Sequence, residues 1–131
     1  SLAGFIGTSF KILSDEFPAA YFLMSASLNP RRVLLQVDGE TVALAFDLRG
    51  AQIAASSSAP EVEIDSTKQT ILDVIDARLT LNDAVWNDAI RVKGKVEDVA
   101  ICHEALLTYV RGAVRCPSFP LLLEQFRRYG L

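Results

Sequence analysis

Cysteine, histidine and positive charge are scarce in this sequence. Its 131 residues include two cysteines and one histidine, and its net charge at pH 7 is −3. One histidine and two distant cysteines do not make up a structural zinc site, so we expect no metal site and no cofactor. A chain without a basic surface lacks the usual electrostatic basis for holding phosphates, which excludes nucleic acid as a partner.

The sequence also lacks an apolar run long enough to cross a membrane. The longest run, residues 17–28, is interrupted by Pro18 and by serines, and it is shorter than the roughly 20 residues that a spanning helix needs. No basic segment precedes it, so it does not resemble a signal peptide. Cys102 and Cys116 lie on one predicted helix, about 20 Å apart, which is too far for a disulfide. Free thiols are typical of a reducing compartment, so we predict a cytoplasmic protein.

Half of the residues are apolar and 22% are charged, which is typical of a globular protein. The length fits one domain, and we predict a single domain over residues 1–131. We divide it into an N-terminal helical segment (1–30), a core (32–114) and a C-terminal extension (117–131). The chain does not begin with Met, which is typical of a processed product or of a domain taken from a longer protein.

The first half of the chain changes from a helical to a strand period. Apolar residues at three- and four-residue steps predict a helix that ends near Asp15, and Pro18 suits the first position of a second helix through Ser25. Alternating residues then predict strands at 33–37 and 42–48, joined by a tight turn at Asp38 and Gly39. Two further strands are predicted at 51–55 and 61–65.

The second half is mainly helical. Ser66 and Gln69 form the pattern of a capping box, and Thr80 with Asp83 forms a second, weaker one. A short strand is predicted at 90–94, then a long helix that ends before Pro117. We expect one face of that helix to consist of Val96, Val99, His103, Leu106, Leu107, Val110 and Val114. Residues 121–129 are predicted to form a last helical turn or two.

Four runs in this order resemble a known family. They are Val-Glu-Ile-Asp at 62–65, Ile-Leu-Asp-Val-Ile at 71–75, Ala-Arg-Leu-Thr-Leu-Asn-Asp-Ala at 77–84 and Ile-Arg-Val-Lys-Gly at 90–94. Their spacing resembles the SCP2-like (sterol carrier protein 2) family over roughly residues 32–111. Thr80-Leu81-Asn82 stands where the family often has Asn-Pro, and the extension has no counterpart. The resemblance implies an α+β fold: a mixed five-stranded sheet with helices on one face and an apolar tunnel between the layers.

The resemblance also implies non-catalytic binding or carriage of a hydrophobic ligand, such as a lipid, a fatty acyl chain, a sterol or a similar metabolite. Each methylene removed from water stabilises such a complex by about 0.8 kcal/mol, so no polar motif is required. For any one candidate, a place in the ordinary core is the more common role, because a pocket and a core need the same residue types. The candidate tunnel residues are Leu44, Phe46, Ile71, Val74, Ile75, Leu79, Trp86, His103, Leu106, Leu107 and Val110.

Three alternatives stay open. An accessory or assembly domain, acting as a homodimer or with a parent enzyme, would show an exposed apolar face on the first helix or on residues 121–126. A small cavity enzyme would need His103 or a carboxylate in the cavity, and no paired candidate exists, so we expect a protein that is not an enzyme. Transient contact with anionic lipid headgroups would use the short basic segments Arg31-Arg32 and Arg127-Arg128-Tyr129.

Overall fold

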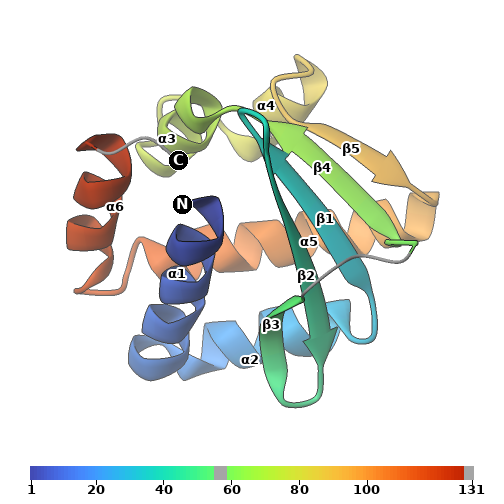
Figure 1. Cartoon of the computed structure of the whole chain (residues 1–131), viewed down its shortest axis with the longest axis horizontal. Coiled ribbons are helices and arrows are strands. Elements are labelled where there is room, and N and C mark those ends of the chain that lie inside the picture. Colours follow the sequence, from blue (N-terminus) through green and yellow to red (C-terminus); the bar gives the residue numbers. More distant parts are fainter. Residues whose placement is uncertain (55–58, 129–131) are drawn as a thin grey trace.

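The computed structural model describes residues 1–54 and 59–128 (Figure 1). Helices and strands both contribute, without the regular βαβ alternation of an α/β fold. In chain order they are α1 (Leu2–Glu16), α2 (Pro18–Leu28), β1 (Arg32–Val37), β2 (Glu40–Asp47), β3 (Gly50–Ala54), β4 (Val62–Ser66), α3 (Lys68–Ile75), α4 (Leu81–Trp86), β5 (Arg91–Gly94), α5 (Val96–Ala113) and α6 (Phe119–Arg128).

The strands form one mixed sheet in the order β3-β2-β1-β4-β5. β1 pairs parallel with β4, and the other neighbouring pairs are antiparallel. Asp38 and Gly39 join β1 to β2 with φ values of 48° and 86°, the left-handed conformations of a tight hairpin turn. The predicted mixed five-stranded sheet and its first hairpin are confirmed.

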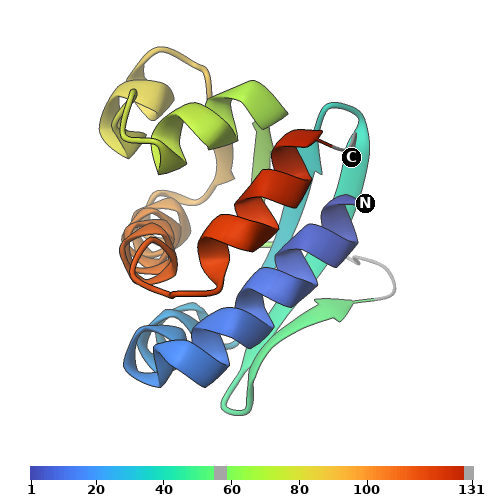
Figure 2. The same ribbon diagram turned by 90° about the vertical axis from the view of Figure 1, so that its left-hand side faces the viewer.

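The helices cover one face of the sheet and leave the other face open (Figure 2). The strands alternate accordingly. In β2, Val42, Leu44 and Phe46 are buried, and in β4 the buried Val62 and Ile64 alternate with the exposed Glu63. The predicted placement of the helices on one face is therefore confirmed, and the hydrophobic core lies between the two layers.

The extension at 117–131 contributes α6, which packs beside α1 (Figure 2). The rings of Phe5 and Phe126 stack with their centroids 4.1 Å apart, and Phe119 lies 6.5 Å from Phe5. The helix begins earlier than predicted, at Phe119, and Pro120 lies in its first turn. Backbone N–H groups of the first turn have no partner within the helix, so proline removes no hydrogen bond there.

The predicted capping box at Ser66 and Gln69 is wrong. Ser66 is the last residue of β4, and its buried hydroxyl donates a hydrogen bond to the carbonyl of Ala89. The residue that caps α3 is Thr67, whose hydroxyl accepts from the backbone N–H of Thr70. The second predicted cap is confirmed, since the Thr80 hydroxyl accepts from the N–H of Asp83.

The expected buried face of α5 is also partly wrong. Val96 and Val114 are 87% and 52% exposed, whereas the buried residues of this helix are Cys102, Ala105, Gly112 and Ala113. The reason is a close approach between helices, because a Cβ on Gly112 would lie 2.8 Å from the Cβ of Ala20 on α2. Small residues therefore form the packed face, and a search for large apolar residues misses them.

Within the described part of the chain, no helix is long and apolar enough to cross a membrane.

Candidate functional site

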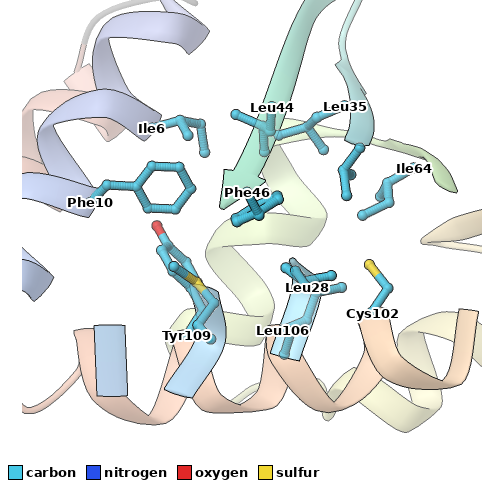
Figure 3. A pocket seen from close by; sticks show the side chains of 13 residues that line it. Ile6, Phe10, Leu28, Leu35, Leu44, Phe46, Ile64, Cys102, Leu106 and Tyr109 are labelled. Atoms are coloured by element: carbon cyan, nitrogen blue, oxygen red, sulfur yellow. The ribbon is translucent and has the colours of Figure 1, made fainter. Parts of the chain in front are cut away.

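Two cavities lie between the sheet and the helices. The first has a volume of about 70 Å³, and Figure 3 shows its side chains converging from α1, from the strands and from α5. Strand alternation directs the buried residues of β1, β2 and β4 into this space, and the apolar stripe of α1 closes it from the side. Its lining residues are Ile6, Phe10, Met24, Leu28, Val33, Leu35, Leu44, Phe46, Ile64, Cys102, Ala105, Leu106 and Tyr109.

The second cavity has a volume of about 110 Å³ and lies toward α3 and α4. Eight residues line only this cavity: Phe5, Ser66, Ile71, Val74, Ile75, Leu81, Ile90 and Val110. Five residues line both cavities: Ile6, Leu35, Ile64, Leu106 and Tyr109. The two spaces therefore adjoin, and these shared side chains form the partition between them.

The lining of both cavities is apolar, and the described residues that form it include no charged residue and no histidine. The polar groups at its edge are already bonded within the protein. Ser66 donates to the carbonyl of Ala89 at 3.0 Å, and Tyr109 donates to the hydroxyl of Ser9 at 2.7 Å. Because burying an unpartnered polar group is unfavourable, these cavities suit hydrocarbon.

Burial keeps the two ionisable groups of the lining neutral. It raises the pKa of Tyr109 to about 12, although the hydrogen bond to Ser9 lowers that pKa in part. Burial likewise raises the pKa of the Cys102 thiol to about 11, against a smaller opposing effect of Arg31. Neither group offers a charge near neutral pH, so neither is suited to act as a nucleophile or base there.

The structure brings most of the predicted tunnel residues to these cavities. Leu44 and Phe46 line the first cavity and Leu106 lines both. Four further candidates line the second: Ile71, Val74, Ile75 and Val110. Leu79 and Leu107 pack against the core but line neither cavity.

Trp86 and His103 lie outside both cavities. Trp86 is 87% exposed, because α4 buries Leu81 and Ala84 three residues apart and Trp86 falls on the other side of this short helix. His103 lies in an open groove beside β5, on a different face of α5 from the buried Cys102 and Ala105. The placement of these two candidates in an internal tunnel is wrong.

Sequence reasoning missed the residues that α1 and α2 contribute. Ile6 and Phe10 from α1, with Met24 and Leu28 from α2, line the first cavity. The apolar stripe of α1 was recognised, but the resemblance begins near residue 32 and assigned no cavity role to the segment before it. The helical periodicity of residues 2–13 was the signal available for it.

Most of the arginines considered for membrane contact are paired with carboxylates. Arg31 forms a 2.8 Å ion pair with Asp98, and both side chains are largely buried. Arg127 pairs with Asp76, which lowers the pKa of that carboxyl, and Arg128 pairs with Glu124. These contacts tie the arginines to the protein's own surface. Tyr129, considered with them, lies outside the described residues.

Comparison with solved structures assigns the fold. A structure described as UbiJ-SCP2 ubiquinone synthesis protein is 13% identical, with 83% of this chain and 89% of that chain covered and a TM-score of 0.62. A crystal structure of sterol carrier protein 2 is 17% identical, with coverages of 87% and 96% and a TM-score of 0.61. Sterol carrier protein 2 from Yarrowia lipolytica, in its apo form, is 14% identical, with coverages of 76% and 88% and a TM-score of 0.50.

No protein-family model matches the sequence, and no curated protein matches it. The likeness is therefore one of structure. The element order, the mixed sheet and the single helical layer give this chain an SCP2-like fold.

Proposed function

We propose that this protein is a non-catalytic binder or carrier of a hydrophobic ligand, such as a lipid, a fatty acyl chain or a sterol. The observation that carries the proposal is the pair of adjoining apolar cavities between the sheet and the helices. The fold supports it, because the solved structures that resemble this chain include ones named sterol carrier protein 2. Each buried methylene would contribute about 0.8 kcal/mol to binding.

The cavities must enlarge to take a long ligand. Their volumes of about 70 and 110 Å³ are below the roughly 300–1,000 Å³ of most ligand pockets. Five residues line both cavities, and Leu106 is one of them. A rotation of Leu106 would join the two spaces into one elongated site along the sheet, with the polar end of the ligand left outside the apolar lining.

The alternatives have less support. An enzyme based on His103 would need that side chain in the cavity, and it lies in the outer groove instead. An assembly role was expected to expose the apolar faces of the first and last helices. Phe5 and Phe10 on α1 and Phe119 and Phe126 on α6 are each at most 8% exposed, whereas Leu121 on α6 is 69% exposed.

We also propose a single domain over residues 1–131 and a cytoplasmic protein. The core is continuous from α1 to α6, which supports the first proposal. The two free cysteines are buried, which is consistent with a reducing compartment and supports the second.

Uptake of a fluorescent fatty acid by matched variants tests the binding proposal. Val110→Trp places a large ring in the second cavity, whereas Val114→Trp makes the same change four residues later, at a 52% exposed position that lines neither cavity. We expect Val110→Trp to weaken binding at least tenfold and Val114→Trp to leave it unchanged. Circular dichroism and thermal unfolding check that both variants fold. Equal binding by the two variants would contradict an internal site.

A further inference from the structure

The two edge strands of the sheet, β3 and β5, differ in the hydrogen bonds that their backbones make. At the β3 edge, the hydroxyl of Tyr21 on α2 accepts a hydrogen bond of 2.9 Å from the backbone N–H of Ala51. At the β5 edge, no side chain or loop of the described residues bonds to the backbone of residues 91–94 beyond the pairing with β4. An unpaired strand edge offers a row of backbone donors and acceptors to another extended segment.

The two sides of β5 differ in character. On the helix side, an open groove of about 590 Å³ lies between β5 and α5, lined mainly by apolar residues. Val96 at the start of α5 is 87% exposed there. The residues of the groove are Val92, Gly94, Val96, Val99, Ala100, His103 and Glu104.

On the open side, β5 carries positive charge. Arg91 and Lys93 are exposed, and they stand opposite Asp65 and Glu63 of β4 in the sheet register. Lys95 continues the same alternation one step beyond the strand. Among the described residues, none of these three basic groups forms a salt bridge within 4.0 Å. An acidic row on the next strand would continue the alternation of charge that β4 and β5 begin.

We propose that the β5 edge binds an extended peptide segment in which acidic and apolar residues alternate. The backbone of the segment would add a strand to the sheet, its acidic side chains would lie beside Arg91 and Lys93, and its apolar side chains would enter the groove at Val96. Strand addition of this kind draws affinity from the main chain and specificity from alternate side chains. A second copy of this protein suits the edge less well, since antiparallel β5 strands would bring their basic rows together.

Fluorescence anisotropy with a labelled eight-residue peptide of alternating glutamate and valine tests the proposal. A peptide of alternating lysine and valine is the control for charge. We expect Arg91→Glu/Lys93→Glu to weaken binding of the glutamate peptide about tenfold and to strengthen binding of the lysine peptide, because two cross-strand charge pairs reverse. Val96→Ser should weaken binding of the glutamate peptide, because it makes the groove more polar and leaves Arg91 and Lys93 in place.

The control variant Lys11→Glu/Arg111→Glu changes the net charge equally at two exposed positions away from β5. It should leave peptide binding unchanged. Amide chemical shifts of residues 91–94 report the site directly and should move on titration. The proposal is overturned if neither peptide binds, if the control variant loses binding as much as the β5 variant, if the shifts at 91–94 stay fixed, or if sedimentation shows that the protein pairs with itself through this edge. Uptake of the fluorescent fatty acid is measured separately, so failure here leaves the cavity proposal intact.

Discussion

The phenol of Tyr109 on α5 donates a 2.7 Å hydrogen bond to the hydroxyl of Ser9 on α1, a residue one hundred positions earlier in the sequence. Ser9 in turn donates to the carbonyl of Ile6, also at 2.7 Å. The pair joins the first helix to the long helix inside the protein. It also satisfies the phenol, so the Tyr109 ring lines both cavities without an unpaired hydroxyl.

The two partners of this bond should differ in their effect on stability. Ser9→Ala leaves the buried phenol without an acceptor, so we expect it to lower the free energy of unfolding by about 1–3 kcal/mol. Tyr109→Phe leaves Ser9 bonded to Ile6, and we expect a loss of only about 0.5–1.5 kcal/mol. Urea denaturation of both variants measures the difference. A larger loss in Tyr109→Phe would contradict the bonding described.

Stability should fall at high pH through Tyr109. Its pKa is raised from an ordinary 10.0 to about 12 in the folded protein. Below pH 10 both states keep the proton and stability is complete. Between pH 10 and 12 the unfolded state loses the proton first, so unfolding becomes easier by up to about 1.4 kcal/mol per pH unit.

Tyr109→Phe removes this contribution and provides the control. Its free energy of unfolding should fall less than that of the wild type between pH 10 and 12, although Cys102 and other groups still titrate in both proteins. If the free energy of unfolding falls equally with pH in the two proteins, burial does not raise the pKa of the Tyr109 phenol as described.

Leu106→Ala should join the two cavities. Leu106 lines both, so its truncation removes part of the partition. We expect stability to fall by roughly 2 kcal/mol and affinity for longer acyl chains to rise relative to shorter ones. Leu107→Ala is the matched control, because Leu107 packs against the core without lining either cavity. Binding of acyl probes of increasing length measures the change, and an unaltered length preference would argue against the partition.

Gly112→Ala should destabilise the protein, contrary to the usual gain of about 1 kcal/mol for this change in a helix. A Cβ on Gly112 would lie 2.8 Å from both the Cβ of Ala20 and the Cδ1 of Leu13. Gly7→Ala on α1 is the control, since its new Cβ would lie 3.9 Å from the nearest side-chain atom and should be tolerated. Thermal unfolding gives the sign for each, and a stabilised Gly112→Ala would disprove the close helix contact.

Local signals in the sequence predicted much of this fold. The Asp38-Gly39 turn between two alternating segments placed β1 and β2, and Thr80 with Asp83 placed the start of α4. Such signals are local because they depend on the backbone conformation of a few neighbouring residues. The parallel pairing of β1 with β4 is not local, and the sequence did not predict it, since the family resemblance implied only that the sheet is mixed.

The errors at the site come from contacts between distant segments. Cys102 and Ala105 face the cavity because α2 packs closely on α5, and nothing within residues 96–114 indicates that neighbour. Trp86 was expected to line the tunnel, but the buried positions of its short helix are Leu81 and Ala84. The partnership of Tyr109 with Ser9 spans most of the chain, and no pattern in either segment predicts it.

Native mass spectrometry of the protein purified from its host, with organic extraction of what it carries, tests the central claim most directly. The account predicts a hydrophobic molecule at near-stoichiometric occupancy in the wild type and its loss in Val110→Trp, with Val114→Trp unchanged. A clean mass of the protein alone, together with no uptake of a fluorescent fatty acid, would contradict ligand binding between the sheet and the helices.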